Sequence, residues 1–411
     1  MDSLAERFSS GSRSIVTPAN QIPRPTRDDL VGRAVALQPL LREHAVAGDT
    51  DRKQSDEVIA GLTEAGLFRM LTPGRYDGYE MDLRTVLEVT SALGEADASA
   101  AWLVSVASVA AFVAGLTSAQ AQKDIFGADP DARIAGGGTG PAPARRVDGG
   151  LRVSGRWSYA SGSHHATWAA LGATVTDDAG AVDGVMCLAP VSEVRMEDTW
   201  RTVGMRATGS NTWVAEDIFV PAHRIISMST LAEGTWSAET DEAMYRLPFV
   251  PLATLPLLGP LLGIGRAALE LTVHSAPHKA MHHTFFARQS DSVGVQVQIA
   301  QATLMLETAQ LHAYHTADEL DGVAARGEQA DYATRARVRA RTGYAAQQVL
   351  DAINILVNVH GAASFAETSR MQQYWRDANT AARHAGLHAM VGYEILGKAL
   401  LGIDERIGPM I

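Results

Sequence analysis

The sequence predicts an α+β protein in which two helical regions flank a β-rich region. In the N-terminal part, apolar residues recur at helical spacing, as at Val58, Leu62 and Ala65. Residues 123–235 instead show short β-rich segments separated by glycine-containing turns. From residue 257 onward, long amphipathic helical patterns return. We therefore expect an N-terminal helical domain, a middle β-barrel or sandwich and a C-terminal four-helix bundle.

The expected domain boundaries follow the changes in this pattern. Residues 1–26 are rich in Ser, Arg and Pro and lack the apolar core of a secretory signal, so we expect a flexible arm. The N-terminal helical domain, the middle β domain and the helical bundle are expected over residues 27–122, 123–238 and 239–411. Within the bundle, the apolar periodicity predicts two long helices over residues 295–320 and 331–360.

Composition and charge exclude several classes of protein. With 46% hydrophobic and 20% charged residues among 411, the chain has the ordinary composition of a soluble globular protein. Its net charge of −11 argues against nucleic acid as a partner, since binding phosphate backbones needs clustered Lys and Arg. The longest apolar region, residues 247–264, contains four prolines, so we expect a buried linker and helix start there and no membrane span. A single cysteine, Cys187, fits a reducing cytoplasm.

Two glycine-containing loops in the β-rich region carry small polar residues that suit a planar cofactor. Their hydroxyl groups and accessible backbone amides can bind the polar edge of a reduced flavin, and Trp157 would form an aromatic wall for its ring. In the alternative interpretation, the loops are ordinary hairpin turns and Trp157 is a core residue. The binding candidates are Ser161 and Gly162 in the first loop, and Thr208, Gly209 and Ser210 in the second.

The C-terminal segment around Arg376 and His384 combines ionisable residues in a pattern that predicts a helix. Asp377 and His384 are seven residues apart and would share a helix face. Histidine titrates near neutrality, so His384 could take a proton from a phenol or an indole-like substrate, or hold a peroxide oxygen by a hydrogen bond. Alternatively, it is a core histidine that is hydrogen-bonded to Asp377 or to a carbonyl. His388, one turn later, is a second candidate.

No motif for a nucleotide or a metal accompanies these residues. The glycine-rich run at residues 136–140 lacks the G-x-G-x-x-G spacing of a dinucleotide site, so we expect a flexible loop near the site. The sequence contains neither a P-loop nor a G-x-S-x-G elbow. The histidine pairs at residues 164–165 and 282–283 are adjacent, so their side chains diverge in a helix or a strand. We expect no metal.

Four motif segments occur along the chain: residues 71–80 with 96–102, residues 155–166, residues 200–210 with Val220 and Pro221, and residues 376–384. In this order they resemble the acyl-CoA dehydrogenase superfamily, and the resemblance covers nearly the whole chain. In dehydrogenases the stretch after Arg-Asp-Ala often carries a catalytic glutamate, whereas residues 379–390 contain no acid here. An Arg-Asp-Ala run followed by His384 resembles the reduced-flavin monooxygenases of two-component systems, which include aromatic hydroxylases and dibenzothiophene monooxygenases.

The resemblance implies the acyl-CoA dehydrogenase fold and a set of cofactor contacts. It places Ser161 near nitrogen 5 of a reduced flavin, which is FAD or alternatively FMN, and it places residues 208–210 along the cofactor. The turn at Gly361 would contact the cofactor of an adjacent subunit, which implies a homo-oligomer, either a dimer or a tetramer. Arg376 would form an ion pair between helices or reach a flavin phosphate from a second subunit.

For function, the resemblance implies a monooxygenase that receives reduced flavin from a separate reductase. It would insert one oxygen atom of O2, through a flavin hydroperoxide, into a small aromatic or heteroaromatic molecule. Trp102, Ser105 and His388 would line the substrate pocket, although Trp102 and Ser105 could equally belong to the core. Two alternatives stay open: an acyl-CoA dehydrogenase-type flavin oxidoreductase whose base lies elsewhere, and a non-catalytic flavin-binding subunit. Product analysis separates the three.

Overall fold

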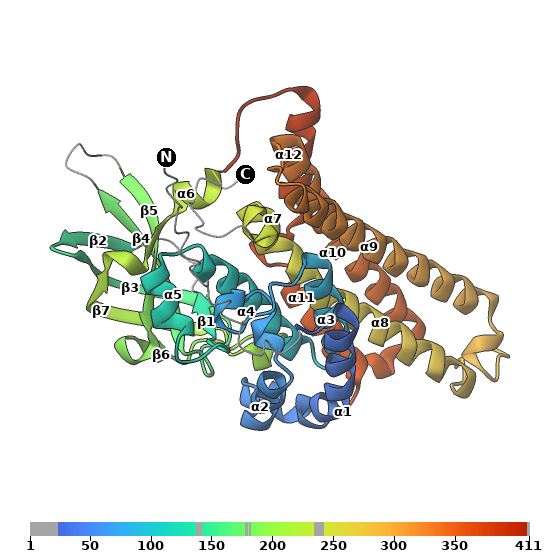
Figure 1. Ribbon diagram of the computed structural model, residues 1–411. Helices are drawn as coiled ribbons and strands as arrows, with labels where there is room; N and C mark the ends of the chain where they lie inside the picture. Colours follow the sequence, from blue (N-terminus) through green and yellow to red (C-terminus); the bar gives the residue numbers. More distant parts are fainter. Residues whose placement is uncertain (1–23, 137–141, 177–179, 181, 234–241, 409–411) are drawn as a thin grey trace, which may run out of the picture.

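The computed structural model describes residues 24–136, 142–176, 180, 182–233 and 242–408. These residues form a helical domain, a sheet domain and a second helical domain in the expected order, which confirms the α+β fold class (Figure 1). The sheet lies at one side of the molecule and the long C-terminal helices at the other, with the N-terminal helices between them. Most of the expected N-terminal arm and residues 137–140 of the glycine-rich run lie outside the described residues.

The helices of the N-terminal domain begin after residues that cap them. They are α1 (Arg27–Asp51), α2 (Asp56–Glu64), α3 (Leu83–Gly94), α4 (Ala98–Gly115) and α5 (Ala119–Phe126). The side chains of Thr26, Ser55, Asp82, Asp97 and Ser118 each accept a hydrogen bond from a backbone N–H in the first turn. Helix α4 is buried along most of its length. Helix α5 extends past residue 122, where we expected the β domain to begin.

The strands of the described middle domain form one sheet with the order β6-β7-β3-β2-β4-β5-β8, and β1 pairs with β4. They are β1 (Ile134–Gly136), β2 (Ala142–Val147), β3 (Gly150–Ala160), β4 (Trp168–Thr176), β5 (Val182–Pro190), β6 (Arg195–Glu197), β7 (Asn211–Pro221) and β8 (Ile225–Ser227). Strand β2 pairs with β3 through residues 144–147 and with β4 through residues 142–143, so it joins the two halves of the sheet. The core of the domain is made of side chains from both halves.

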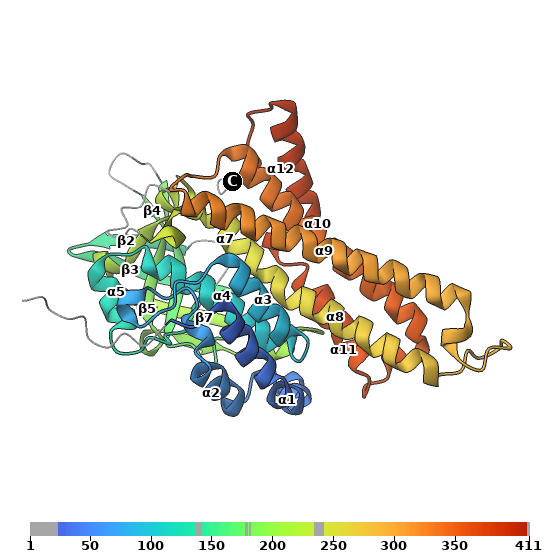
Figure 2. The ribbon, with the colours of Figure 1, turned by 45° about the vertical axis from the view of Figure 1, so that its right-hand side comes forward.

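The C-terminal domain is built on long helices that run alongside one another (Figure 2). Helix α6 (Met228–Glu233) packs mainly against β5 and β8 of the sheet. The helices of the C-terminal domain are α7 (Phe249–Thr254), α8 (Leu258–Ser275), α9 (Val293–Ala325), α10 (Tyr332–His360), α11 (Arg370–Ala381) and α12 (Ala389–Leu401). Helices α9 and α10 contain the two long helices expected at residues 295–320 and 331–360. The shorter α11 and α12 pack against α10.

Two described segments are apolar and long enough to cross a membrane by length and composition, namely α4 and Phe249–His278. In both, 83% of the apolar window is buried inside the protein. The second segment includes the expected buried linker, which forms α7, a 3₁₀ turn and the start of α8. Their burial shows that both segments belong to the core of the described fold.

Helices α3 and α8 approach each other closely because two glycines meet at their contact. A Cβ atom on Gly263 of α8 would lie 2.7 Å from Gly94 Cα of α3 and closer still to Ser91 O. A Cβ atom on Gly94 would lie 2.8 Å from Pro260 O. This contact joins the N-terminal domain to the bundle, and no side chain fits in it.

We expect Gly263→Ala to lower the free energy of unfolding by about 1–3 kcal/mol, because the added methyl group forces α3 and α8 apart. The matched control is Gly397→Ala in α12, where a Cβ atom would meet no atom within 4 Å. The control should raise the free energy of unfolding by roughly 0.5–1 kcal/mol, since alanine is the better helix former. Urea unfolding measures both changes, and shifts of the same sign would contradict the close contact.

Candidate active site

A cavity of about 980 Å³ lies where the three domains meet. Its walls come from α4, from the inner strands of the sheet, from the loop at residues 200–210, from α7 and from the C-terminal end of α11 with the turn that follows. Most of the lining side chains are apolar. Of the sequence-predicted site residues, the cavity brings together Trp102, Ser161, Thr208, Ser210 and His384.

One edge of the cavity carries a chain of hydroxyl groups from the two loops that the sequence singled out. Ser161 Oγ lies 2.7 Å from Ser210 Oγ, which lies 2.7 Å from Thr208 Oγ1. Thr208 Oγ1 donates to Met205 O at 2.8 Å, and Trp102 Nε1 donates to Ser161 Oγ at 3.3 Å. Since the Thr208 proton is used on Met205, Ser210 donates to Thr208 and Ser161 donates to Ser210. Ser161 therefore has no proton left for a ligand and presents only a lone pair to the cavity.

The two predicted glycines hold these loops together and do not line the main cavity. Gly162 N donates to Thr208 O at 2.8 Å, and Ser163 Oγ donates to Gly209 O at 2.7 Å. Gly162 has φ +82° and Gly209 has φ +51°, which are left-handed conformations that favour glycine. The hydroxyl groups that the sequence singled out in the two loops thus reach the cavity. The glycines instead allow the two loops to pack against each other.

His384 lines the same cavity as this hydroxyl chain, from the turn after α11. Helix α11 ends at Ala381, so the expectation that His384 shares a helix face with Asp377 is wrong. Instead, His384 Nδ1 accepts a hydrogen bond from Gly386 N at 3.1 Å and caps a short 3₁₀ turn. The ring packs edge-on against Trp102, with 5.5 Å between the ring centroids. His388 is exposed and lies outside the lining of the cavity.

The surroundings of His384 favour the neutral form of its ring. The side chain is exposed toward the cavity, but the protein atoms around it, and after them the charge of Arg339, lower the pKa of His384 below its ordinary value. Arg339 is itself buried and donates from Nη2 to Ala385 O at 2.6 Å, which holds the turn in place. Because Nδ1 accepts from Gly386, the proton of the neutral ring sits on Nε2. Among the described residues no protein acceptor takes that proton, so Nε2 can donate to a ligand in the cavity.

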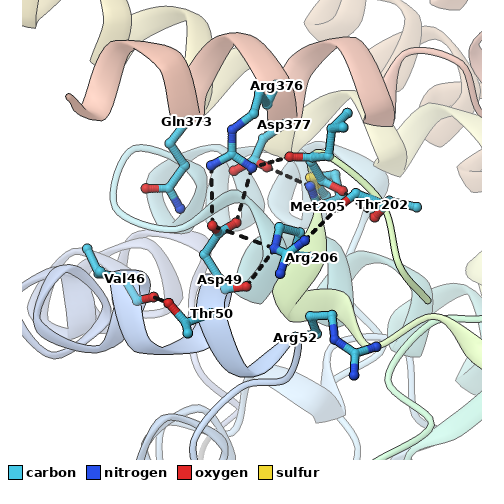
Figure 3. A network of polar contacts seen from close by, with 12 residues as sticks. Val46, Asp49, Thr50, Arg52, Thr202, Met205, Arg206, Gln373, Arg376 and Asp377 are labelled. Atoms are coloured by element: carbon cyan, nitrogen blue, oxygen red, sulfur yellow. Dashed lines mark hydrogen bonds and ion pairs between the residues drawn. The ribbon is translucent and has the colours of Figure 1, made fainter. Parts of the chain in front are cut away.

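A network of polar contacts, buried at Asp377 and partly exposed elsewhere, holds the loop at residues 200–210 (Figure 3). Asp377 of α11 is buried and accepts a hydrogen bond from Met205 N at 2.6 Å. Arg376 forms an ion pair with Asp49 of α1 at 3.3 Å and donates to Val203 O. Arg206 donates to the carbonyls of Asp49 and Thr202, at 2.7 and 2.8 Å. The predicted ion-pair role of Arg376 between helices is thus present within this chain.

Three further predicted residues lie away from the cavity. Trp157 is fully buried in the core of the sheet domain, where its Nε1 donates to Gly172 O at 2.7 Å, so it is a core residue and no wall of the cavity. Ser105 is buried and donates to Pro256 O at 3.2 Å. Gly361 lies at the C-terminal end of α10 and outside the lining of the cavity.

Several lining residues were not predicted from the sequence. Two aromatic side chains, Tyr159 and Trp200, line the cavity and contact each other edge-on at 6.0 Å between centroids. Both belong to motif segments. Aromatic residues next to the two polar loops could therefore have been predicted to line the site. Phe249 of α7 and Arg383 beside His384 also line the cavity. Nothing in the local sequence distinguishes Phe249 from a core residue.

The sequence matches the acyl-CoA dehydrogenase N-terminal domain over residues 34–126 and the C-terminal domain of the same family over residues 257–389. It is 32% identical over 375 residues to a flavin-dependent monooxygenase, oxygenase subunit HsaA, of Rhodococcus jostii (strain RHA1), covering 90% of this chain and 98% of that protein. The chain belongs to this flavin-dependent monooxygenase family. The resemblance noted in the sequence is thereby confirmed, and the acyl-CoA dehydrogenase fold with it.

Two more members of the family extend the comparison. The oxygenase component of an FADH(2)-dependent resorcinol hydroxylase from Rhizobium sp. (strain MTP-10005) is 26% identical over 389 residues, covering 92% of this chain and 95% of that protein. The structure of XiaF from Streptomyces sp., in complex with FADH2 and glycerol, superposes with a TM-score of 0.90 at 33% identity. The superposition covers 94% of this chain and 98% of the XiaF chain.

The buried carboxyl of Asp377 gives a prediction for pH dependence. Burial raises its pKa from the ordinary 3.8 to about 7, so the folded protein holds a proton that the unfolded chain releases between these values. Stability therefore falls as pH rises through this window. Asp377→Asn keeps an oxygen for Met205 N but cannot ionise, so it should remove that fall, which amounts to roughly a few kcal/mol. Urea unfolding at pH 5 and pH 8 measures it.

The exposed carboxyl of Asp404 serves as the control for this measurement. Asp404→Asn should keep the pH dependence of the wild type. If Asp377→Asn and the wild type lose the same free energy of unfolding between pH 5 and pH 8, Asp377 does not carry the buried proton.

Proposed function

We propose that this chain is an oxygenase component that receives reduced flavin from a separate reductase and uses O2 to hydroxylate a small aromatic or heteroaromatic molecule. The observation that supports it most strongly is that one cavity, lined mostly by apolar side chains, contains both the hydroxyl chain ending at Ser161 and the ring of His384. Reduced FAD is the proposed cofactor, since relatives are named for FADH(2) or bind FADH2, and FMN is the alternative.

The cavity suits a flavin ring together with a small aromatic ligand. At about 980 Å³ it is at the upper end of the roughly 300–1,000 Å³ typical of small-molecule pockets. Apolar side chains such as Val106, Val109 and Met186 provide surfaces for ring faces, and the hydroxyl chain provides one polar edge. When bound, a reduced flavin supplies the electrons that activate dioxygen for oxygen transfer. With flavin and substrate in place, the apolar walls would exclude water from this chemistry.

The direction of the hydroxyl chain favours the reduced cofactor. Reduced flavin carries a hydrogen on nitrogen 5, whereas oxidised flavin has only a lone pair there. Ser161 Oγ donates its proton to Ser210 and accepts a hydrogen bond from Trp102. The remaining lone pair of Ser161 Oγ can accept a hydrogen bond from a ligand in the cavity. An acceptor matches the N–H of the reduced ring and repels the lone pair of the oxidised ring.

His384 is proposed to donate a hydrogen bond from Nε2 to an oxygen of the substrate or of the activated dioxygen. With Nδ1 bound to Gly386 N, the neutral ring has no free lone pair in the cavity, so removing a substrate proton would first require breaking that bond. This arrangement favours hydrogen-bond donation over the action of a general base.

The dehydrogenase alternative receives no support from the cavity. Among the described residues that line it there is no Asp or Glu, and the ionisable side chains are Tyr159, Arg201, Arg383 and His384. Removal of a substrate proton by a carboxylate, as in the dehydrogenases, has no counterpart there.

The proposal includes a homo-oligomer. Val297, Leu304 and Leu311 of α9 are 59%, 63% and 70% exposed and recur every seven residues, which forms an apolar stripe along one helix face. Leu400 and Leu401 at the end of α12 are each 77% exposed. Contiguous apolar surface of this kind is typical of faces that a second copy covers. A second copy would also bring the turn at Gly361 toward a neighbouring site.

Reconstitution with and without a reductase tests this function. The purified chain with NADH and oxidised FAD should give no product, and addition of a flavin reductase should start hydroxylation of a phenol or heteroaromatic compound from a panel. Under ¹⁸O2 the product should carry one labelled oxygen atom. Turnover without a reductase would contradict the two-component scheme. Electron transfer from an acyl thioester would support the dehydrogenase alternative, and binding of reduced flavin with neither reaction would support a non-catalytic subunit.

Substitutions of His384 separate donation from base catalysis. His384→Ala should lower product formation about 100-fold, as does the loss of one well-placed hydrogen-bond donor. Oxygen should still be consumed, so hydrogen peroxide replaces product. His384→Gln retains an N–H near the position of Nε2 and should keep activity within about tenfold of the wild type. Product and peroxide are measured together.

A third variant, His384→Asn, is the matched control for the turn, because its Oδ1 can accept from Gly386 N while it lacks the distal donor. It should behave like His384→Ala. Equal inactivity of the glutamine and alanine variants would instead assign His384 the role of a base.

A further inference from the structure

A narrow hollow of about 20 Å³ lies directly behind Ser161, separate from the main cavity. It shares Val106, Ile134 and Ser161 with the main cavity, so the two spaces adjoin at these residues. The hollow lies between α4 and the first strand of the sheet, and Gly162 borders it on the side of the polar loop.

On its other side, the hollow adjoins an open groove of about 540 Å³ at the protein surface. The two spaces share Ile59, Arg133 and His165. The groove is also lined by exposed residues of α2, including Asp56 and Ala60, so it opens to solvent. Surface groove, narrow hollow and main cavity thus follow one another in a row that ends at Ser161.

The hollow has the size and the lining for a small apolar molecule. Its inner walls include the side chains of Phe68, Leu103 and Ala107. A space of this volume holds about one water-sized molecule, but an ordered water needs roughly two to four polar partners. A diatomic gas needs none. The polar side chains in the lining, those of Ser161, Arg133 and His165, are already hydrogen-bonded within the protein, so the lining favours gas over water.

Polar contacts fix the residues that the hollow shares with the outer groove. Arg133 Nε donates to His165 O at 2.7 Å, and His165 Nε2 lies 3.1 Å from Gln54 O. The Arg133 guanidinium also lies over the Phe68 ring, 5.6 Å from its centroid. These contacts hold in place the residues that lie between the groove and the hollow.

We propose that these three spaces form a path along which dioxygen reaches the cavity beside Ser161, apart from the space that the flavin and the aromatic substrate occupy. The proposal rests on the proposed function, because it places the oxygen-reactive edge of the flavin at Ser161. A flavin and a substrate together would fill much of the main cavity. A rear path lets dioxygen arrive at the reacting edge after both are bound.

The first test needs no flavin. Crystals of the unliganded protein are pressurised with xenon, which occupies apolar spaces that admit dioxygen. We expect a xenon atom in the hollow, between Leu103 and Ala107 of α4 and Ile134 of β1. Ala107→Leu fills this space and should remove the xenon. An empty hollow in pressurised wild-type crystals would overturn the proposal whether or not the chain is a monooxygenase.

The second test measures the reaction with oxygen. Anaerobic complex of the protein with reduced FAD is mixed with dissolved O2 in a stopped-flow instrument. We expect Ala107→Leu to lower the bimolecular rate constant about tenfold, because a narrowed path slows diffusional access. The dissociation constant of reduced FAD should be unchanged. Ala60→Leu, the same change in the wide outer groove, should react like the wild type, and Ala107→Val provides a smaller filling side chain if the leucine variant fails to fold.

The outcomes of the two tests are distinguishable. An unchanged rate constant in a variant whose hollow no longer binds xenon would show that dioxygen enters through the main cavity, and would overturn the path. Failure of the wild-type protein to bind reduced FAD would overturn the proposed function, while the xenon result would still decide whether the hollow admits gas.

Discussion

The hydrogen bond between the buried Asp377 carboxyl and Met205 N is the contact on which the cavity depends. It ties the loop at residues 200–210 to α11, and the loop carries Thr208 and Ser210 of the hydroxyl chain. The neighbouring Arg376 extends this attachment to Asp49 of α1 (Figure 3). Burying a carboxyl is costly, which is why its pKa rises. This costly buried carboxyl lies where all three domains meet. There it fixes the loop at residues 200–210 as a rigid wall of the cavity.

The chemistry of the cavity follows from the direction of its hydrogen bonds. On one side, each hydroxyl donates to the next until the last proton reaches Met205 O, so Ser161 faces a ligand as an acceptor. On the other side, Gly386 N occupies Nδ1 of His384, so the ring faces a ligand as a donor. An acceptor and a donor thus line one largely apolar cavity. The acceptor Ser161 suits the N–H at nitrogen 5 of a reduced flavin. The donor His384 suits an oxygen atom of the substrate or of activated dioxygen.

The fold and part of the site were predictable from the sequence because they rest on local patterns. The three regions, the long helices α9 and α10 and the two polar loops all show in periodicity and turn residues. The resemblance placed Ser161 and residues 208–210 beside the same cofactor, and the structure adds that Ser161 Oγ and Ser210 Oγ lie 2.7 Å apart.

Other features were not predictable because they arise from contacts between distant segments. Alternation along β3 marks Trp157 as buried but does not say whether it faces the core or the cavity. Residues 379–390 contain a single glycine, Gly386, and no proline, so the end of α11 before His384 had no clear local signal. The contact of Arg376 with Asp49 joins residues 327 positions apart. The narrow hollow exists only because α2, α4 and the sheet pack together.

The most direct test of the site is a crystal structure of the protein soaked with reduced FAD under anaerobic conditions. We expect the flavin ring in the main cavity, with its nitrogen 5 edge within hydrogen-bond distance of Ser161 Oγ. His384 should line the part of the cavity that the flavin leaves free for the substrate. A ring bound outside this cavity, or one that turns its nitrogen 5 edge away from Ser161, would contradict the assignment of the hydroxyl chain as the flavin-binding edge.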